Sequence, residues 1–167
     1  MGYHAFIITS HLGKLLEAII NERLKSHLES EGHLSPYQSG FRNCKETMEQ
    51  VVRIEADIRK ANDMGMVLCG VFLDISKAFD TAQHCYILKH LNQYNVKGNM
   101  FNYCKDFMSK RLFSVKVGNS VSEMFSQHNG VPQGEVISPT LFLISINEIS
   151  KVLNKRSCIG QYADDTA

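Results

Sequence analysis

Hydrophobic residues near the start of the chain recur at steps of three and four positions, which is typical of an amphipathic helix. This spacing predicts a helix over residues 12–28, with Ser10 as its N-cap and Gly32 just beyond its end. After a loop over residues 35–40, the same spacing predicts a second helix over about residues 45–61. The apolar faces consist of Leu12, Leu15, Leu16, Ile19, Ile20, Leu24 and Leu28 in the first helix, and of Met48, Val51, Val52 and Ile58 in the second.

The middle of the chain predicts a strand followed by two helical segments. Residues 66–73 form a nearly continuous apolar run, consistent with a strand that is buried on both faces. Ser76 is suited to cap a third helix that extends to about Tyr94. Gly98 opens the next helical segment, whose apolar positions are Phe101, Cys104, Phe107 and Met108.

The hydrophobic period then changes from helical spacing to alternation, which predicts a β-hairpin. Its strands cover residues 113–117 and 121–127, and Gly118-Asn119 form the turn between them.

The last third of the chain predicts a loop, a helix and a strand. Residues 131–134 form the loop. The helix runs from Ser138 to about Ile149, with Ser138 as N-cap and Pro139 at the first helical position. A short apolar strand follows over residues 158–163, and the sequence shows no partner for it.

Charge and hydropathy limit the partners that the chain can be expected to bind. The 167 residues carry 18 Lys and Arg against 17 Asp and Glu, so overall charge gives no argument for nucleic-acid binding. Between Asn95 and Ser120, however, five basic residues stand against one acidic residue. Such a cluster is typical either of local contact with a phosphate backbone or of an ordinary solvated surface, and the sequence leaves both interpretations open. The longest apolar run is far shorter than a membrane span requires, so no membrane partner is expected.

Three carboxylates are candidates for chemistry. Asp74 follows the predicted strand at 66–73, and Asp164 with Asp165 follows the last predicted strand. Carboxylates delivered from two strand ends can gather around hard divalent cations, and a pair of such ions supports phosphoryl transfer. Acidic residues are also common in turns without any catalytic role, and spacing alone leaves both interpretations open.

The residues around these carboxylates resemble the reverse transcriptases, in particular those of non-LTR (LINE-type) retrotransposons. A fingers motif and three palm motifs occur in the order and with the gaps of that family, and the resemblance runs over nearly the whole chain. The motifs are Gln38-Ser39-Gly40-Phe41-Arg42, Phe72-Leu73-Asp74-Ile75-Ser76-Lys77-Ala78-Phe79-Asp80, Gly130-Val131-Pro132-Gln133-Gly134 with Ile137-Ser138-Pro139-Thr140-Leu141-Phe142, and Tyr162-Ala163-Asp164-Asp165.

This resemblance implies an RNA-directed DNA polymerase that joins deoxynucleoside triphosphates to a primer 3′-hydroxyl on an RNA template. Asp74, Asp164 and Asp165 would hold two Mg²⁺ ions, or Mn²⁺ in their place, with the Ile75 carbonyl as a further ligand. Phe79 would exclude a 2′-hydroxyl from the sugar site.

Further roles follow from the same resemblance. Gln133 and Gly134 would border the incoming nucleotide, and Arg42 would contact the template strand. Asp80 matches the family motif, but its position favours a charge at a helix amino terminus and not a metal ligand.

The resemblance also implies an α+β fold, with a palm that is an antiparallel sheet backed by helices, together with helical fingers. Residues 1–65 are expected to form the fingers side and residues 66–167 the palm, cut after the acidic motif and before the thumb. Without a thumb or a partner for the last strand, the chain alone is expected to lack processive polymerase activity. A retrotransposon enzyme is expected in the nucleus or the cytoplasm.

The sequence departs from the family at several positions. His4 stands where the family has an arginine that reaches the triphosphate, and Glu135 brings a negative charge where a small serine is usual, close to a polyanionic substrate. These departures leave open a non-catalytic RNA- or heteroduplex-binding relic of a decayed element. A group II intron-type reverse transcriptase is a further alternative.

Overall fold

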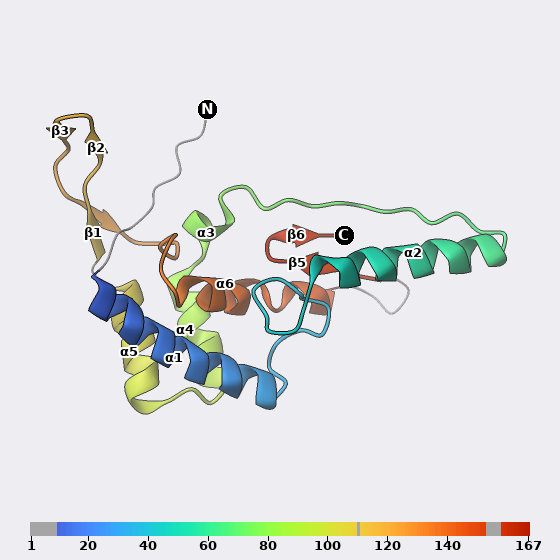
Figure 1. Cartoon of the computed structure of the whole chain (residues 1–167), viewed down its shortest axis with the longest axis horizontal. Helices are drawn as coiled ribbons and strands as arrows, with labels where there is room; N and C mark the ends of the chain where they lie inside the picture. Colours follow the sequence, from blue (N-terminus) through green and yellow to red (C-terminus); the bar gives the residue numbers. More distant parts are fainter. Residues whose placement is uncertain (1–9, 110, 153–157) are drawn as a thin grey trace.

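The computed structural model describes residues 10–109, 111–152 and 158–167, so the position of His4 lies outside the described residues. Helices dominate the fold, and short strands lie between and after them (Figure 1). The helices are α1 (His11–Ser30), α2 (Thr47–Asp63), α3 (Ala78–Thr81), α4 (His84–Gln93), α5 (Gly98–Met108), α6 (Ser138–Ile146) and the 3₁₀-helix η1 (Ile149–Val152). The strands are β1 (Arg111–Phe113), β2 (Lys116–Val117), β3 (Ser120–Val121), β4 (Phe125–Gln127), β5 (Gln161–Tyr162) and β6 (Asp165–Thr166).

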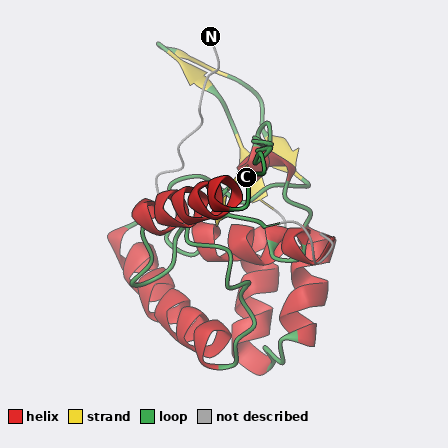
Figure 2. Ribbon diagram, turned by 90° about the vertical axis from the view of Figure 1, so that its right-hand side faces the viewer, coloured by secondary structure: helices red, strands yellow, loops and turns green. Residues whose placement is uncertain are grey.

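The hydrophobic core lies between helices. Helix α4 packs against both α5 and α6, and the second half of α1 contributes to the same core. Figure 2 shows the hairpin of β2 and β3 projecting from the helices, and Figure 1 shows α2 extending away from the body formed by α1, α4, α5 and α6. The side chains with no exposed surface in this core are Leu24, Leu28, Ile87, Leu91, Cys104, Ile137, Leu141 and Ile144.

Helix α1 confirms the predicted position, but its buried side differs from the predicted apolar face. Ser10 caps the helix by accepting a hydrogen bond from the Gly13 N–H at 3.1 Å. Glu17 and Asn21 are buried with Leu24 and Leu28, whereas Leu12, Leu15, Leu16 and Ile19 are exposed. Asn21 is held by the hydroxyl of Thr140 in α6 at 2.6 Å, so hydrogen bonds compensate for burying polar residues.

Helix α2 also forms close to the predicted residues. Its buried positions are Gln50 and Ala61, and its apolar face, which comprises Met48, Val51, Val52 and Ile58, is exposed. The 3.6-residue period therefore identified both helices but did not identify the side on which each packs.

The prediction of a buried strand over residues 66–73 is wrong. Figure 1 shows this segment as a long extended connection between α2 and α3. All of its residues are exposed, and within the described residues its only β-pairing joins Leu73 to Thr166. An apolar run becomes a buried strand only where neighbouring strands pair with it, and β6 is two residues long and reaches only Leu73.

The helix predicted from Ser76 to Tyr94 is broken into α3 and α4. The loop before Gln133 takes over the carbonyls that a continuous helix would use: the Val131 N–H donates to the Phe79 carbonyl at 2.8 Å, and the Gly130 N–H donates to the Ala82 carbonyl at 2.7 Å. The break lies at Ala82, and Lys77 takes the N-cap position predicted for Ser76.

The predicted hairpin is confirmed, in two short ladders. β1 pairs with β4 and β2 pairs with β3, both antiparallel, and Gly118 adopts a φ of 58° in the turn. The predicted strands also cover residues 114–115 and 122–124, which lie between the two ladders and belong to neither.

The final part of the chain corrects two predictions. Ile137 is the N-cap of α6, so Ser138 and Pro139 both lie in its first turn. The last strand, β5, has a partner after all, because Asp165 and Thr166 turn back as β6. The fold thus mixes helices with three separate two-stranded antiparallel sheets in the described part of the chain, in place of one larger sheet.

Candidate catalytic site

Backbone pairing joins four segments around the acidic turn. β5 and β6 pair through Gln161 with Thr166 and through Tyr162 with Asp165. On the outer side of β6, the Leu73 N–H donates to the Thr166 carbonyl at 2.8 Å, and the Thr166 N–H donates back at 3.0 Å. On the outer side of β5, Gln161 bonds to the segment at residues 37–39. Segments more than ninety residues apart in sequence therefore meet beside the turn.

The pairing brings the predicted metal ligands together at the level of the backbone. Asp74 follows Leu73 and Asp165 precedes Thr166, so both carboxylates stand at the same end of one antiparallel pair. Asp164 occupies the turn itself and is half-buried, whereas Asp74 and Asp165 are exposed. The two acidic sequence motifs thus meet through the pairing of Leu73 with Thr166.

The side chains are less closely gathered than the backbone. Among the described residues, no three Asp, Glu, His or Cys side chains form a group able to hold a metal ion. The donors nevertheless suit hard divalent cations chemically, since all three are carboxylates and two of them face solvent. Ile75, the predicted carbonyl ligand, has a half-buried side chain that packs against the core.

Phe79 lies in an aromatic cluster beside this site. Its ring stacks on Phe142 of α6 with 4.4 Å between centroids, and the Phe41 ring meets it edge-on at 6.0 Å. Phe142 is buried, and Phe79 is half-buried. The position of the Phe79 ring is therefore set by packing from below, which leaves part of the ring accessible.

The loop that carries Gln133 and Gly134 is hydrogen-bonded to α3 and to the residue that follows it. Besides the two backbone bonds to Phe79 and Ala82, the Gln133 side-chain amide donates to Asp80 at 3.5 Å, the limit of a hydrogen bond. Gly134 is exposed and adopts a φ of 96°, in the region that favours glycine. Asp80 lies in the first turn of α3, as predicted for a structural charge.

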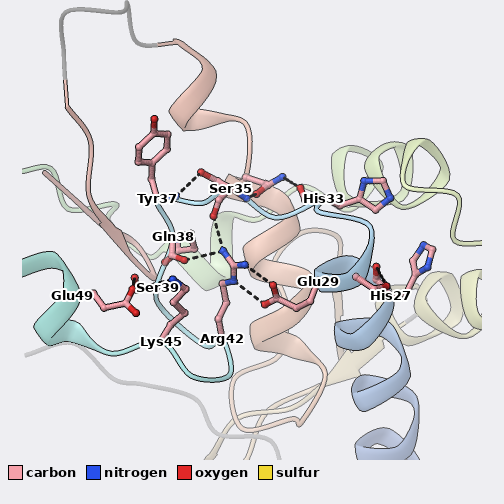
Figure 3. Close-up of polar contacts among 12 residues, drawn as sticks. His27, Glu29, His33, Ser35, Tyr37, Gln38, Ser39, Arg42, Lys45 and Glu49 are labelled. Atoms are coloured by element: carbon pink, nitrogen blue, oxygen red, sulfur yellow. Dashed lines mark hydrogen bonds and ion pairs between the residues drawn. The ribbon is translucent and has the colours of Figure 1, made fainter. Parts of the chain in front are cut away.

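Arg42 has extensive partners within the chain. Figure 3 shows its guanidinium between the end of α1 and the loop that follows. It forms a two-bond ion pair with Glu29 and donates to the carbonyls of Ser35 at 2.6 Å and Gln38 at 3.1 Å. This arrangement braces the loop at residues 35–42. Contact of Arg42 with a template stays a prediction.

Glu135, which is expected from the sequence to bring a negative charge near a polyanionic substrate, is buried within the chain. Its side chain has no exposed surface and lies 3.7 Å from Arg111. Next to it is the buried Glu17, whose carboxylate accepts a bond from the Val136 N–H at 2.9 Å. Burial raises the pKa of Glu17, and the charge of Glu135 raises it further. Glu135 therefore belongs to a buried acidic pair under the loop.

This pair predicts a pH-dependent stability. Because the folded-state pKa of Glu17 is raised, its stabilising contribution is present at low pH and is lost as pH rises through that pKa. We expect Glu17→Gln to stabilise the chain at pH 7, because the variant buries no charge at this position, and the difference from wild type should shrink toward pH 4. Thermal melts across this range measure it. Glu22→Gln, an exposed site on the same helix, is the control, and an equal effect in both variants would contradict the prediction.

Sequence reasoning missed the role of Gln38 next to the acidic turn. Its side chain is buried and bonds to both backbone groups of Ala163, as described below. Gln38 stood within a recognised motif, but a glutamine in a loop gives no sequence signal for a partner 125 residues away.

A turn carrying two aspartates, paired to an extended segment that carries a third, provides the oxygen ligands that metal-dependent phosphoryl transfer requires. Residues 2–167 match the family of reverse transcriptases (RNA-dependent DNA polymerases), so the chain belongs to this family. The prediction of family made from the motifs is confirmed.

Several similar proteins come from mobile elements of insects. The chain is 30% identical to the probable RNA-directed DNA polymerase from transposon BS and to that from mobile element jockey, both of Drosophila melanogaster, over 99% of its length. It is 29% identical over 95% of its length to the retrovirus-related Pol polyprotein from type-1 retrotransposable element R2 of Popillia japonica. The chain spans 19%, 19% and 22% of these relatives, respectively.

These relatives are non-LTR retrotransposon proteins, as the motifs predicted. Enzymes of the family generally use divalent metal ions, an RNA template and nucleotide substrates. In the described part of the chain, none of the helices combines the length and apolar character needed to cross a membrane.

Proposed function

We propose that this chain is the catalytic part of a retrotransposon RNA-directed DNA polymerase, in which Asp74, Asp164 and Asp165 bind two Mg²⁺ ions. The observation that carries the proposal is the pair of backbone hydrogen bonds between Leu73 and Thr166, because it joins the two acidic motifs. Such ions, when bound, neutralise charge on the triphosphate and activate the primer 3′-hydroxyl.

The remaining residues of the site have positioning roles in this proposal. The Ile75 carbonyl adds an oxygen ligand, and Phe79, backed by Phe142, excludes a 2′-hydroxyl from the sugar site. Gln133 and Gly134 border the incoming nucleotide. The Arg42 guanidinium is bonded to Glu29 and to two backbone carbonyls. In this proposal it therefore acts on the template strand indirectly, by fixing the conformation of the protein loop at residues 35–42.

The proposal includes the domain assignment and the partners. Residues 1–65 form the fingers side and residues 66–167 the palm, and an RNA template, a DNA primer and deoxynucleoside triphosphates are the substrates. The enzyme acts in the nucleus or the cytoplasm.

One observation favours a second function. The three carboxylate side chains are not grouped around a common point in the described structure. A non-catalytic module that binds RNA or a heteroduplex would need no such grouping, and it would bind nucleic acid without binding metal at the acidic turn.

Metal binding separates the two functions. We expect the chain to bind Mn²⁺, measured from the loss of the free-ion signal in electron paramagnetic resonance. Asp74→Asn and Asp164→Asn should each weaken binding by about tenfold or more, because each removes a charged ligand. Asp106→Asn, an exposed carboxylate on α5, is the control and should bind like wild type. Equal Mn²⁺ binding by all four proteins would contradict the proposed site.

A further inference from the structure

We propose that Gln38 is a positioning residue for the catalytic turn: its side-chain amide fixes the backbone of Ala163 and thereby the directions of Asp164 and Asp165. The inference rests on the proposed function, in which these two carboxylates bind metal. Gln38 is 3% exposed and lies 125 residues from the turn in sequence.

One amide group bonds to both backbone polar groups of Ala163. The Gln38 Oε1 accepts from the Ala163 N–H at 2.9 Å and also from the Gly40 N–H at 2.8 Å. The Gln38 Nε2 donates to the Ala163 carbonyl at 3.0 Å. A residue held through both its N–H and its C=O cannot rotate its peptide planes freely, so the residue that follows, Asp164, is oriented as well.

The turn needs such support because its geometry is unfavourable for its sequence. Ala163 adopts a φ of 55°, a left-handed conformation that a non-glycine residue rarely takes. Ala163 is also buried, and it lies between the paired positions Tyr162 and Asp165, outside the strand ladder. Its backbone groups therefore depend on a side-chain partner, and Gln38 supplies the partner for both.

The position of Gln38 is itself fixed against β5. The Ser39 N–H donates to the Gln161 carbonyl at 2.9 Å, and the Gln161 N–H donates to the Tyr37 carbonyl at 3.0 Å. At Gly40 the two backbones approach so closely that a β-carbon would lie 2.8 Å from the Ala163 Cα. The loop at residues 37–40 thus forms a rigid base under the turn.

Gln50 of α2 provides a matched control, because its side chain bonds to the same loop. Its side chain is also buried, and its amide donates to the Ser39 hydroxyl at 2.7 Å and to the Tyr37 carbonyl at 3.2 Å. Gln50→Met removes a buried amide from the base of the loop, and Gln38→Met removes the one that holds the turn. A loss of loop stability alone should affect both variants alike.

The first measurement is hydrogen exchange at the Ala163 amide by nuclear magnetic resonance. We expect this amide to exchange slowly in wild type and in Gln50→Met, and at least tenfold faster in Gln38→Met, because only Gln38 accepts its proton. If the amide exchanges equally in wild type and in Gln38→Met, the proposal is overturned.

The second measurement is Mn²⁺ affinity. We expect Gln38→Met to bind about tenfold more weakly than wild type and Gln50→Met to bind like wild type. An equal loss in both variants would overturn the positioning role. Should Gln38→Met not fold, Gln38→Glu takes its place, because an ionised carboxylate keeps an acceptor for Ala163 but loses the donated bond. Wild type that binds no Mn²⁺ would refute the proposed metal site, whereas the exchange data decide separately whether Gln38 holds the turn.

Discussion

Gly40→Ala is expected to destabilise the chain by about 2–3 kcal/mol and to weaken metal binding at the acidic turn, because the site cannot accommodate a β-carbon. The added atom would meet the backbone of Ala163, which is anchored by Gln38 and by the ladder of β5 and β6. No flexible side chain can move aside there. The turn has to shift, and the carboxylates of Asp164 and Asp165 shift with it.

Urea unfolding and Mn²⁺ titration of the same samples test this expectation. Gly70→Ala is the control, because a β-carbon at Gly70 would lie 3.5 Å from the ring of Phe72, an ordinary contact on an exposed segment. The control should keep wild-type affinity. The prediction is wrong if the two alanine variants unfold at the same urea concentration.

Phe142→Ala is expected to cost about 3–5 kcal/mol, the largest effect of any substitution considered for this chain. The ring is 1% exposed in the centre of the core, and it supports Phe79 from below at 4.4 Å. Its removal leaves a cavity and also frees the Phe79 ring. The substitution thus tests how firmly the core fixes Phe79, the residue proposed to exclude a 2′-hydroxyl from the sugar site.

Denaturant unfolding measures the cost, and Phe113→Ala is the control, since that aromatic ring lies in the exposed hairpin. A double-mutant cycle between Phe79→Leu and Phe142→Leu isolates the stacking itself. We expect a coupling free energy of about 1 kcal/mol, as is usual for a well-stacked aromatic pair. Additive effects would show that Phe142 supports the core but does not position Phe79.

Local chemistry made parts of this fold predictable. The helix capped by Ser10 begins where a hydroxyl can accept from the Gly13 N–H, and the hairpin turns at Gly118, where φ is positive. Both signals act within a few residues, so the amino-acid order is sufficient to specify them. The four ordered motifs identified the family for a similar reason, because they are contiguous residues.

The two predictions of secondary structure that the structure contradicts failed because they depend on contacts distant in sequence. The run at residues 66–73 has the composition of a buried strand, yet strand formation depends on which segments lie beside it, and only Leu73 finds a partner in the described structure. The break at Ala82 arises because Gly130 and Val131 take over carbonyls that a helix would use. Neither event is encoded in the residues where it occurs.

The sequence by itself determined the family, the position of most helices and the hairpin, and the identity of Asp74, Asp164 and Asp165 as candidate ligands. Only the tertiary structure decided that Leu73 pairs with Thr166, that Gln38 holds Ala163, and that Glu135 is buried beside Glu17. Periodicity, caps and motifs are properties of neighbouring residues. Contacts between residues more than ninety positions apart depend on how the whole chain packs, and a single sequence carries no local signal for them.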